Sequence, residues 1–389
     1  MKKEDKLNMF WSPNSILSGV NAIKEVGVEA RRLKGKKVLI VTDKGVSKAG
    51  LVEKVKELLK KEKLEVEIFN KVEPEPHIAT VDLCTKIIKE NKYDLVIGLG
   101  GGSSIDVAKG ASAAAQNKMS IREYLGMDKI PEPGLPKILI PTTAGTGSEV
   151  SRAIVLIDEK TGAKTAAYSS YLLADIAIVD PLMTLTMPPK VTIDTGMDAL
   201  VHAIEAYLSV NAHLHTDILA LKAINLIGDN LRKVFANPKN IEARYNMCMG
   251  SLFAGMSFTG AGLGGVHALA YPLDSEYHFT HGRSNAVMLP YVMEFNEISS
   301  LPKFAIIAKE MGEKLEGLPL REAADKAIIS IRKLLKDLAI PERLQDYGVP
   351  KEALPNLAKS GFTSGARLLP NNPRIIDLEG AMEIYKKAW

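Results

Sequence analysis

The stretch LVIGLGGGSSIDVAK, residues 95–109, joins an apolar run, three glycines and the start of a helix. Five apolar or small residues in a row are typical of a strand that is covered on both faces. The alanine-rich run at 107–115 has the composition of a helix. A strand that turns directly into a helix is half of a βαβ unit, so this stretch predicts a parallel sheet.

The residues around this stretch repeat the same alternation. Short β-branched runs at 37–42, 66–69 and 137–141 read as strands, and amphipathic patterns at 51–59 and 81–92 read as helices. After residues 187–190 the strand patterns stop. Six further helices are predicted, at 191–209, 213–236, 241–259, 301–315, 321–338 and 378–388.

A chain of 389 residues is too long for one hydrophobic core. We therefore expect two domains: an α/β, Rossmann-like domain with a parallel sheet over residues 1–188, and an all-α domain over residues 189–389. The active site is expected in the cleft between them.

Composition excludes several classes of protein. The chain has 50 basic and 46 acidic residues without long blocks of one sign, so no nucleic-acid partner is expected. No apolar run approaches about 20 residues and the first residues lack an apolar signal region, so neither a membrane span nor secretion is expected. Cys84 and Cys248 are interpreted as buried, reduced thiols. These features predict a cytoplasmic protein.

The glycines and the first strand suggest a nucleotide site. Gly100, Gly101 and Gly102 allow close approach of a ligand, and the amides of the following helix can bind a pyrophosphate. Ser103 and Asp106 have capping-box spacing, so a well-capped tight turn without a ligand is the alternative. Unlike the usual dinucleotide fingerprint, the acidic residue comes first, since Asp43 ends the strand at 37–42. Asp43 either binds ribose hydroxyls or caps the next helix.

A second polar motif follows the strand at 137–141. Four hydroxyl residues surround two glycines there, at the strand end where open parallel sheets bind ligands. They are Thr142, Thr143, Thr146 and Ser148. A polar turn is the alternative, but this density of hydroxyls favours ligand contact.

The helical half carries donors for a metal ion. Asp198 and His202 lie one helical turn apart, a pair that alone is equally typical of an ordinary ion pair. His267, His278 and His281 fall within fifteen residues of one another. One Asp with three His is a nitrogen and oxygen set suited to Fe²⁺ or Zn²⁺. Glu205 is interpreted as a partner of a ligand or a solvated residue.

Five ordered motifs resemble those of the iron-dependent (group III) alcohol dehydrogenases. They are GGGSxxDxAK, PTTAGTGSE, DALxHAIE, the pair GxxHALA and HG, and the closing NNPR to IYKKAW. The resemblance implies an NAD(P)-dependent oxidoreductase with a dehydroquinate synthase-like architecture, assembled as a homodimer or larger oligomer. It also implies four metal ligands, Asp198, His202, His267 and His281.

The resemblance further implies cofactor contacts. These are Gly100, Gly101, Gly102, Ser103, Asp106, Thr142, Thr143, Thr146, Ser148 and Lys164. Asp43 matches a position where Asp favours NAD over NADP. Glu75 stands before Pro76 where relatives often have Asn, so an adenine-ribose contact at that position is not carried over.

Proton transfer is the main departure from the family pattern. Many relatives have a second His where this chain has Tyr271, and many lack a His at the position of His278. An imidazole titrates near neutral pH and a phenol does not. We therefore expect His278 to relay the proton and Tyr271 to shape the substrate pocket. The alternative is that His278 caps a loop and the alkoxide forms by direct exchange with solvent.

The predicted reaction is reversible oxidation of a primary alcohol or small diol to the aldehyde, with Fe²⁺ or alternatively Zn²⁺, and with NAD preferred and NADP the alternative. A Zn²⁺-dependent glycerol or polyol dehydrogenase is the nearest alternative. A dehydroquinate synthase-like lyase would need clustered basic residues, and residues 262–289 offer only Arg283. A non-enzymatic nucleotide-binding protein would leave the Asp and three His unexplained.

Overall fold

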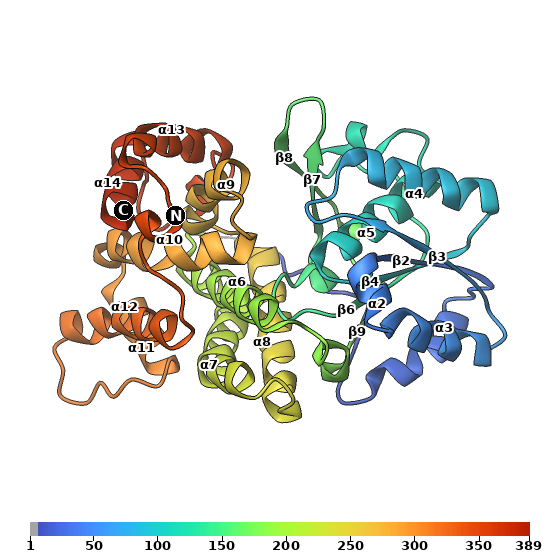
Figure 1. Ribbon diagram of the computed structural model, residues 1–389, viewed down its shortest axis with the longest axis horizontal. Coiled ribbons are helices and arrows are strands. Elements are labelled where there is room, and N and C mark those ends of the chain that lie inside the picture. The colour runs from blue at the N-terminus through green and yellow to red at the C-terminus, as the bar shows by residue number, and fades with distance from the viewer. Residues whose placement is uncertain (1–6) are drawn as a thin grey trace. The chain divides into compact units, whose positions relative to one another are not determined.

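The computed structural model describes residues 7–389, which form two compact units. One unit spans Trp11–Met187 and contains the strands (Figure 1). The other spans Pro188–Trp389 together with residues 7–10 and is helical. A parallel sheet with helices followed by a helical region confirms the predicted fold class.

A six-stranded parallel sheet forms the centre of the first unit. Its strands, in spatial order, are β1 (Ser15–Ser18), β9 (Ile176–Val179), β6 (Lys137–Pro141), β4 (Leu95–Gly100), β2 (Lys37–Asp43) and β3 (Glu65–Val72). Every residue of β4 is buried, which explains its unbroken apolar sequence. Strands β2, β3, β4 and β6 match the four segments that the sequence predicted as strands. The four-residue strands β1 and β9 were not predicted.

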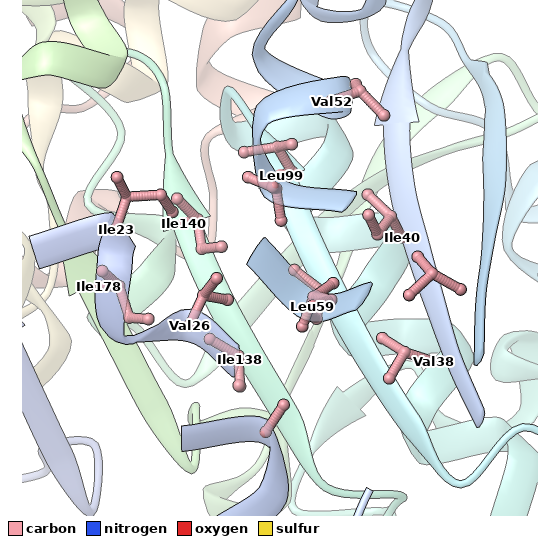
Figure 2. Close-up of a cluster of buried hydrophobic side chains, with 14 of the residues drawn as sticks. Ile23, Val26, Val38, Ile40, Val52, Leu59, Leu99, Ile138, Ile140 and Ile178 are labelled. Atoms are coloured by element: carbon pink, nitrogen blue, oxygen red, sulfur yellow. The ribbon is translucent and has the colours of Figure 1, made fainter. Parts of the chain in front are cut away.

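Helices cover both faces of this sheet. They are α1 (Val26–Arg32), α2 (Lys44–Lys48), α3 (Leu51–Lys61), α4 (Ile78–Asn91) and α5 (Gly102–Gln116). Figure 2 shows Val26 and Leu59 packed against Val38, Ile40 and Ile138 of the sheet. Each such side chain contributes about 1.5–3 kcal/mol when fully buried. These residues form part of the apolar core of the first unit.

A smaller sheet accompanies the main one. It contains β5 (Gly126–Met127), β8 (Ala163–Tyr168) and β7 (Ala153–Asp158), with β7 and β8 antiparallel. The sequence did not predict these strands. They position Lys164, one of the predicted cofactor contacts, on β8.

The second unit is built from nine α-helices within the described residues. They are α6 (Pro189–Leu208), α7 (Leu214–Ala236), α8 (Ile241–Ala261), α9 (Gly265–Tyr277), α10 (His281–Asn296), α11 (Leu301–Glu310), α12 (Leu320–Asp337), α13 (Leu354–Ser364) and α14 (Leu378–Ala388). The sequence predicted six of them. It missed α9, α10 and α13, and both α9 and α10 contain an internal proline, Pro272 and Pro290.

Both cysteines are buried, reduced thiols, as predicted. Cys84 lies on α4 in the first unit and Cys248 on α8 in the second. Burial raises the pKa of the Cys84 thiol. Across residues 7–389, no individual helix has both the length and the hydropathy of a membrane span, and only α8 and α9 taken as a pair bent by 108° meet that test.

Candidate metal and cofactor sites

The glycine motif forms a sharp turn between β4 and α5. β4 ends at Gly100, Gly101 is the N-cap, and α5 begins at Gly102. The capping box predicted for Ser103 and Asp106 is wrong, because Ser103 already lies inside the helix. The Asp106 carboxylate instead accepts hydrogen bonds from Ser148 Oγ (2.5 Å) and from the backbone N–H of Val155 (2.9 Å).

The hydroxyl-rich loop lies directly beside this glycine turn. The Thr142 N–H donates to the Gly100 carbonyl at 2.9 Å. A Cβ atom at Gly102 would lie 2.8 Å from Thr146 Cγ2, so any other residue here would require Thr146 to shift. The structure therefore brings Gly100, Gly102, Thr142 and Thr146 together at the carboxyl ends of β4 and β6, where parallel sheets bind ligands.

A buried lysine that the sequence did not single out holds the two loops together. Lys109 on α5 has no exposed surface. Its ammonium donates to the Ser148 carbonyl (2.9 Å), Ser148 Oγ (3.2 Å), Ser151 Oγ (3.2 Å) and the Ala153 carbonyl (2.5 Å). Ser148 is thus bonded to both Asp106 and Lys109. These contacts give Asp106 and Ser148 a role in positioning the loops.

Burial alters the titration of the charged groups in this cluster. It lowers the pKa of Lys109 to about 8, against the opposing charges of Asp106 and Glu149. It raises the pKa of the neighbouring Glu149 to about 7. A lysine and two carboxyl groups inside one core are tolerable only because they are paired and hydrogen-bonded.

Asp43 caps the next helix, which is one of the two alternatives that the sequence left open, and ribose binding stays a prediction. It is the N-cap of α2, where its Oδ1 accepts from the backbone N–H groups of Gly45 (2.7 Å) and Val46 (2.9 Å). Its Oδ2 accepts from Ser104 Oγ at 3.2 Å, which places the carboxylate beside the glycine turn. Lys164 forms an ion pair with Glu75, with 2.5 Å between Nζ and Oε1.

Three helices of the second unit supply the candidate metal ligands. Asp198 and His202 lie on α6, His267 on α9 and His281 at the first position of α10. The start of α10 is pressed against α6, because a Cβ at Gly282 would lie 2.0 Å from the Asp194 carbonyl oxygen. Thr280 Oγ1 and Arg283 Nε bond the two Asp194 carboxylate oxygens at 2.6 and 2.9 Å.

The four predicted ligands meet around one carboxylate oxygen. Asp198 Oδ1 lies 3.7 Å from His202 Nε2, 3.7 Å from His267 Nε2 and 3.9 Å from His281 Nε2. Asp198, His267 and His281 each offer one ligand atom, and these three atoms all lie within 4.8 Å of one another. The His202 ring stacks on the His267 ring with 4.8 Å between centroids.

Two further carboxylates hold the imidazole rings. Glu205 Oε2 lies 2.6 Å from His267 Nδ1, and Asp274 Oδ2 lies 2.8 Å from His281 Nδ1. Each contact directs Nε2 of the ring toward Asp198. Metal-binding histidines commonly have such carboxylate partners, which fix the tautomer and raise the basicity of the ligand. The sequence anticipated this role for Glu205 but missed Asp274, although it lies seven residues, two helical turns, after His267.

The set is buried except at one histidine. The side chains of Asp198, His202 and His267 are at most 6% exposed, whereas that of His281 is 34% exposed. Burial would raise the pKa of Asp198, but the three histidines hold it well below its ordinary value. Burial alone would lower the pKa of His267, but the nearby carboxylates of Glu205 and Asp198 outweigh this effect and raise the pKa to about 9.

This chemistry fits a divalent metal ion. Three imidazole nitrogens and one carboxylate oxygen suit Fe²⁺ or Zn²⁺, and the charge of Asp198 offsets that of the cation. The exposed His281 leaves one side of the set open. A catalytic site needs such an opening, whereas a structural metal site is closed.

The two candidate proton-transfer residues are placed differently. Tyr271 on α9 is 9% exposed, and its ring stacks on that of His281 with 6.0 Å between centroids. Arg367 Nη2 donates to the Tyr271 hydroxyl at 3.1 Å. His278 ends α9 in the left-handed conformation (φ 56°) with an exposed side chain.

Comparisons with known proteins agree across both units. The family model described as iron-containing alcohol dehydrogenase matches residues 13–181. The model for the C-terminal part of the Fe-containing alcohol dehydrogenase family matches residues 192–389. Together the two matches cover most of the chain.

Individual relatives match over nearly their full length. Long-chain-alcohol dehydrogenase 1 of Geobacillus thermodenitrificans is 42% identical, over 95% of this chain and 94% of its own. A crystal structure of 1,3-propanediol oxidoreductase superposes with a TM-score of 0.96 at 40% identity, covering 99% of this chain and 100% of that one. Sulfoacetaldehyde reductase from Bifidobacterium kashiwanohense, solved with NAD⁺, gives 0.90 at 30% identity, covering 98% and 99%.

Proposed function

Because this chain belongs to the iron-containing alcohol dehydrogenase family, and is a metal-dependent oxidoreductase of alcohols, we propose that it interconverts a primary alcohol or small diol and the aldehyde using NAD. The observation that carries the proposal is the convergence of Asp198, His202, His267 and His281 on one point of the second unit. Relatives named for long-chain alcohols and for 1,3-propanediol support the substrate class.

The four side chains would hold the metal ion, with Fe²⁺ as the expected ion and Zn²⁺ as the alternative. When bound, the ion would supply polarisation of the substrate oxygen, and NAD would supply the group that accepts or returns the hydride. Glu205 and Asp274 keep His267 and His281 oriented as ligands. The exposed side of His281 is where a substrate oxygen would enter.

The first unit would bind the nucleotide. The glycine turn offers backbone N–H groups at the start of α5 for the pyrophosphate, and Thr142, Thr143 and Thr146 offer hydroxyls. Lys109 and Asp106 lock the two loops in place. Asp43, beside the turn, would accept bonds from ribose hydroxyls and repel a 2′-phosphate, which favours NAD over NADP.

Alcohol oxidation also releases a proton, which needs a route to solvent. His278 is the proposed relay because it is an exposed imidazole that follows the helix carrying His267. Tyr271, stacked on His281, would shape the substrate pocket.

The proposed protein is a homodimer or larger oligomer in the cytoplasm, and it has no nucleic-acid or membrane partner. Two reduced cysteines are usual for a cytoplasmic protein. A glycerol or polyol dehydrogenase using Zn²⁺ remains the second candidate, since the same donors suit that ion. A dehydroquinate synthase-like lyase is disfavoured, because the Arg283 guanidinium is already paired with Asp194.

The test combines metal analysis with an activity assay. Protein purified without oxygen is analysed for bound metal and assayed by NADH absorbance with a panel of primary alcohols, diols and glycerol, using NAD and NADP. His267→Ala and His281→Ala are expected to lose both metal and turnover while remaining folded. Full metal content and activity in either variant would remove these histidines from the active site.

A further inference from the structure

Asn285 lies among the candidate metal ligands, although none of the sequence motifs described above includes it. It is on α10, one turn after His281, and has no exposed surface. Its Nδ2 lies 2.8 Å from Asp198 Oδ1, 3.1 Å from His267 Nε2 and 3.3 Å from His281 Nε2. The carboxamide therefore contacts three of the four ligand atoms.

The surroundings decide which way the carboxamide faces. Asp198 Oδ1, at the centre of the set, is a carboxylate oxygen that accepts and does not donate, and the Asn285 carboxamide lies 2.8 Å from it. An N–H donor is the group that such a position requires. The shortest of the three contacts is with Asp198, the only carboxylate among the four ligands.

The other half of the carboxamide is unusual. Asn285 Oδ1 is buried and has no hydrogen-bond partner among the described residues. A buried amide with one unsatisfied atom is uncommon and costs stability.

The packing of α10 on α6 does not depend on this side chain. Thr280 and Arg283 already join the two helices through Asp194, and Gly282 allows the close approach. The Asn285 side chain contacts Asp198, His267 and His281 through its Nδ2 atom.

We propose that Asn285 is a positioning residue of the metal site, which orients the Asp198 carboxylate toward the ion through its Nδ2–H group. The inference rests on the proposed metal site. It adds that affinity for the ion depends on a neutral side chain that is not itself one of the four ligands. Partners of this kind typically contribute 10–100-fold to metal affinity.

Two substitutions test it with Zn²⁺ as the probe. Asn285→Ala removes the donor, and the Zn²⁺ dissociation constant, measured by competition with a chromophoric chelator, should rise at least tenfold. Asn285→Asp keeps the shape but replaces the donor by a second carboxylate oxygen near Asp198. Zn²⁺ should then bind more tightly than to wild type, while the thermal midpoint of the chelated protein should fall because the two carboxylates repel each other.

Asn230→Leu is the matched control. Asn230 is a buried Asn on α7 whose amide bonds to the Leu226 carbonyl (2.8 Å) and to Asn246 (3.3 Å). This variant should lose stability without changing Zn²⁺ affinity. The visible spectrum of the Co²⁺-loaded protein gives a second readout, since a disturbed Asp198 changes its intensity.

The outcomes separate the two proposals. If Asn285→Ala binds Zn²⁺ within twofold of wild type while His267→Ala does not bind it, the positioning role is wrong and the metal site stands. If Asn285→Asp does not tighten binding, the carboxamide does not face the ion. If His267→Ala retains Zn²⁺, the metal site itself is misplaced and the inference falls with it.

Discussion

Glu205 Oε2 and His267 Nδ1 lie 2.6 Å apart inside the helical unit, and neither side chain is more than 6% exposed. The second Glu205 oxygen, Oε1, accepts from the Val266 N–H, also at 2.6 Å. One carboxylate thus fixes both the backbone at the start of α9 and the ring of the histidine that follows. Both oxygens are needed for this double contact.

Glu205→Gln should weaken metal binding without removing a ligand. An amide has one acceptor oxygen, so it can satisfy Val266 or His267 but not both, and it lacks the charge that raises the basicity of the ring. The metal dissociation constant should rise about 10–100-fold. Glu313→Gln, at a partly buried carboxylate bonded to Ser330 and Lys333, should leave it unchanged. Equal affinities in the two variants would reduce Glu205 to a packing role.

Asp43 controls the choice of nucleotide in our proposal. Asp43→Gly should raise the NADP/NAD ratio of kcat/KM by about 5–150-fold, corresponding to about 1–3 kcal/mol for loss of a like-charge contact. Glycine also removes the cap of α2, so Asp43→Asn is the sharper variant, because its amide oxygen can still accept from Gly45 and Val46. A ratio that stays constant in both variants would place the ribose elsewhere.

The proton relay is tested by pH–rate profiles. His278→Ala should abolish the rising limb of kcat with pH, whereas Tyr271→Phe should change KM for bulky alcohols and keep the limb. Loss of the limb only in Tyr271→Phe would reverse the assignment. An unchanged limb in both variants would mean that the proton reaches solvent without a side-chain relay.

Glu149 should make stability depend on pH. Its pKa is raised by burial from 4.5 to about 7, so the folded chain holds a proton between these values that the unfolded chain has released. The contribution of Glu149 to the free energy of unfolding is therefore fully present below pH 4.5. It declines as pH rises through about 7, and the total loss is roughly 3 kcal/mol. Above pH 8, deprotonation of buried Lys109 acts in the opposite direction.

The measurement is urea unfolding of the wild type and Glu149→Gln at several pH values from 4.5 to 7.5. The variant should lose most of the decline, because glutamine does not titrate. A decline that persists undiminished in the variant would assign it to another group.

The strands and the residues of the candidate metal site differ in how well they could be predicted from the sequence. β4 and β2 are continuous apolar runs, so local periodicity is enough to predict them. The one-turn spacing of Asp198 and His202 is equally typical of an ion pair, and the full set of four ligands came from the family resemblance. Asp274, Asn285 and Lys109 gain their roles only when separate elements meet. No local pattern distinguishes Asp274 and Asn285 from ordinary helix residues, and the GGGSxxDxAK motif that ends at Lys109 does not reveal what its ammonium contacts.

Two errors have specific physical causes. α9 and α10 were missed because Pro272 and Pro290 argue against a helix, but both helices are buried by their neighbours and tertiary packing outweighs propensity. The capping box at Ser103 failed because α5 begins one residue earlier, at Gly102, and the Asp106 carboxylate is bonded instead to Ser148, 42 residues away. Local rules cannot weigh a partner so distant in sequence.

Cys84 and Cys248 give the molecule one buried thiol in each compact unit. A thiol reagent can reach either sulfur only when its own unit opens. Mass spectrometry of the two labelled peptides would therefore report the opening rates of the α/β and helical units separately, in one unmodified sample. Adding NAD should protect Cys84 first, and adding metal should protect Cys248 first, so each ligand would identify the unit that it stabilises.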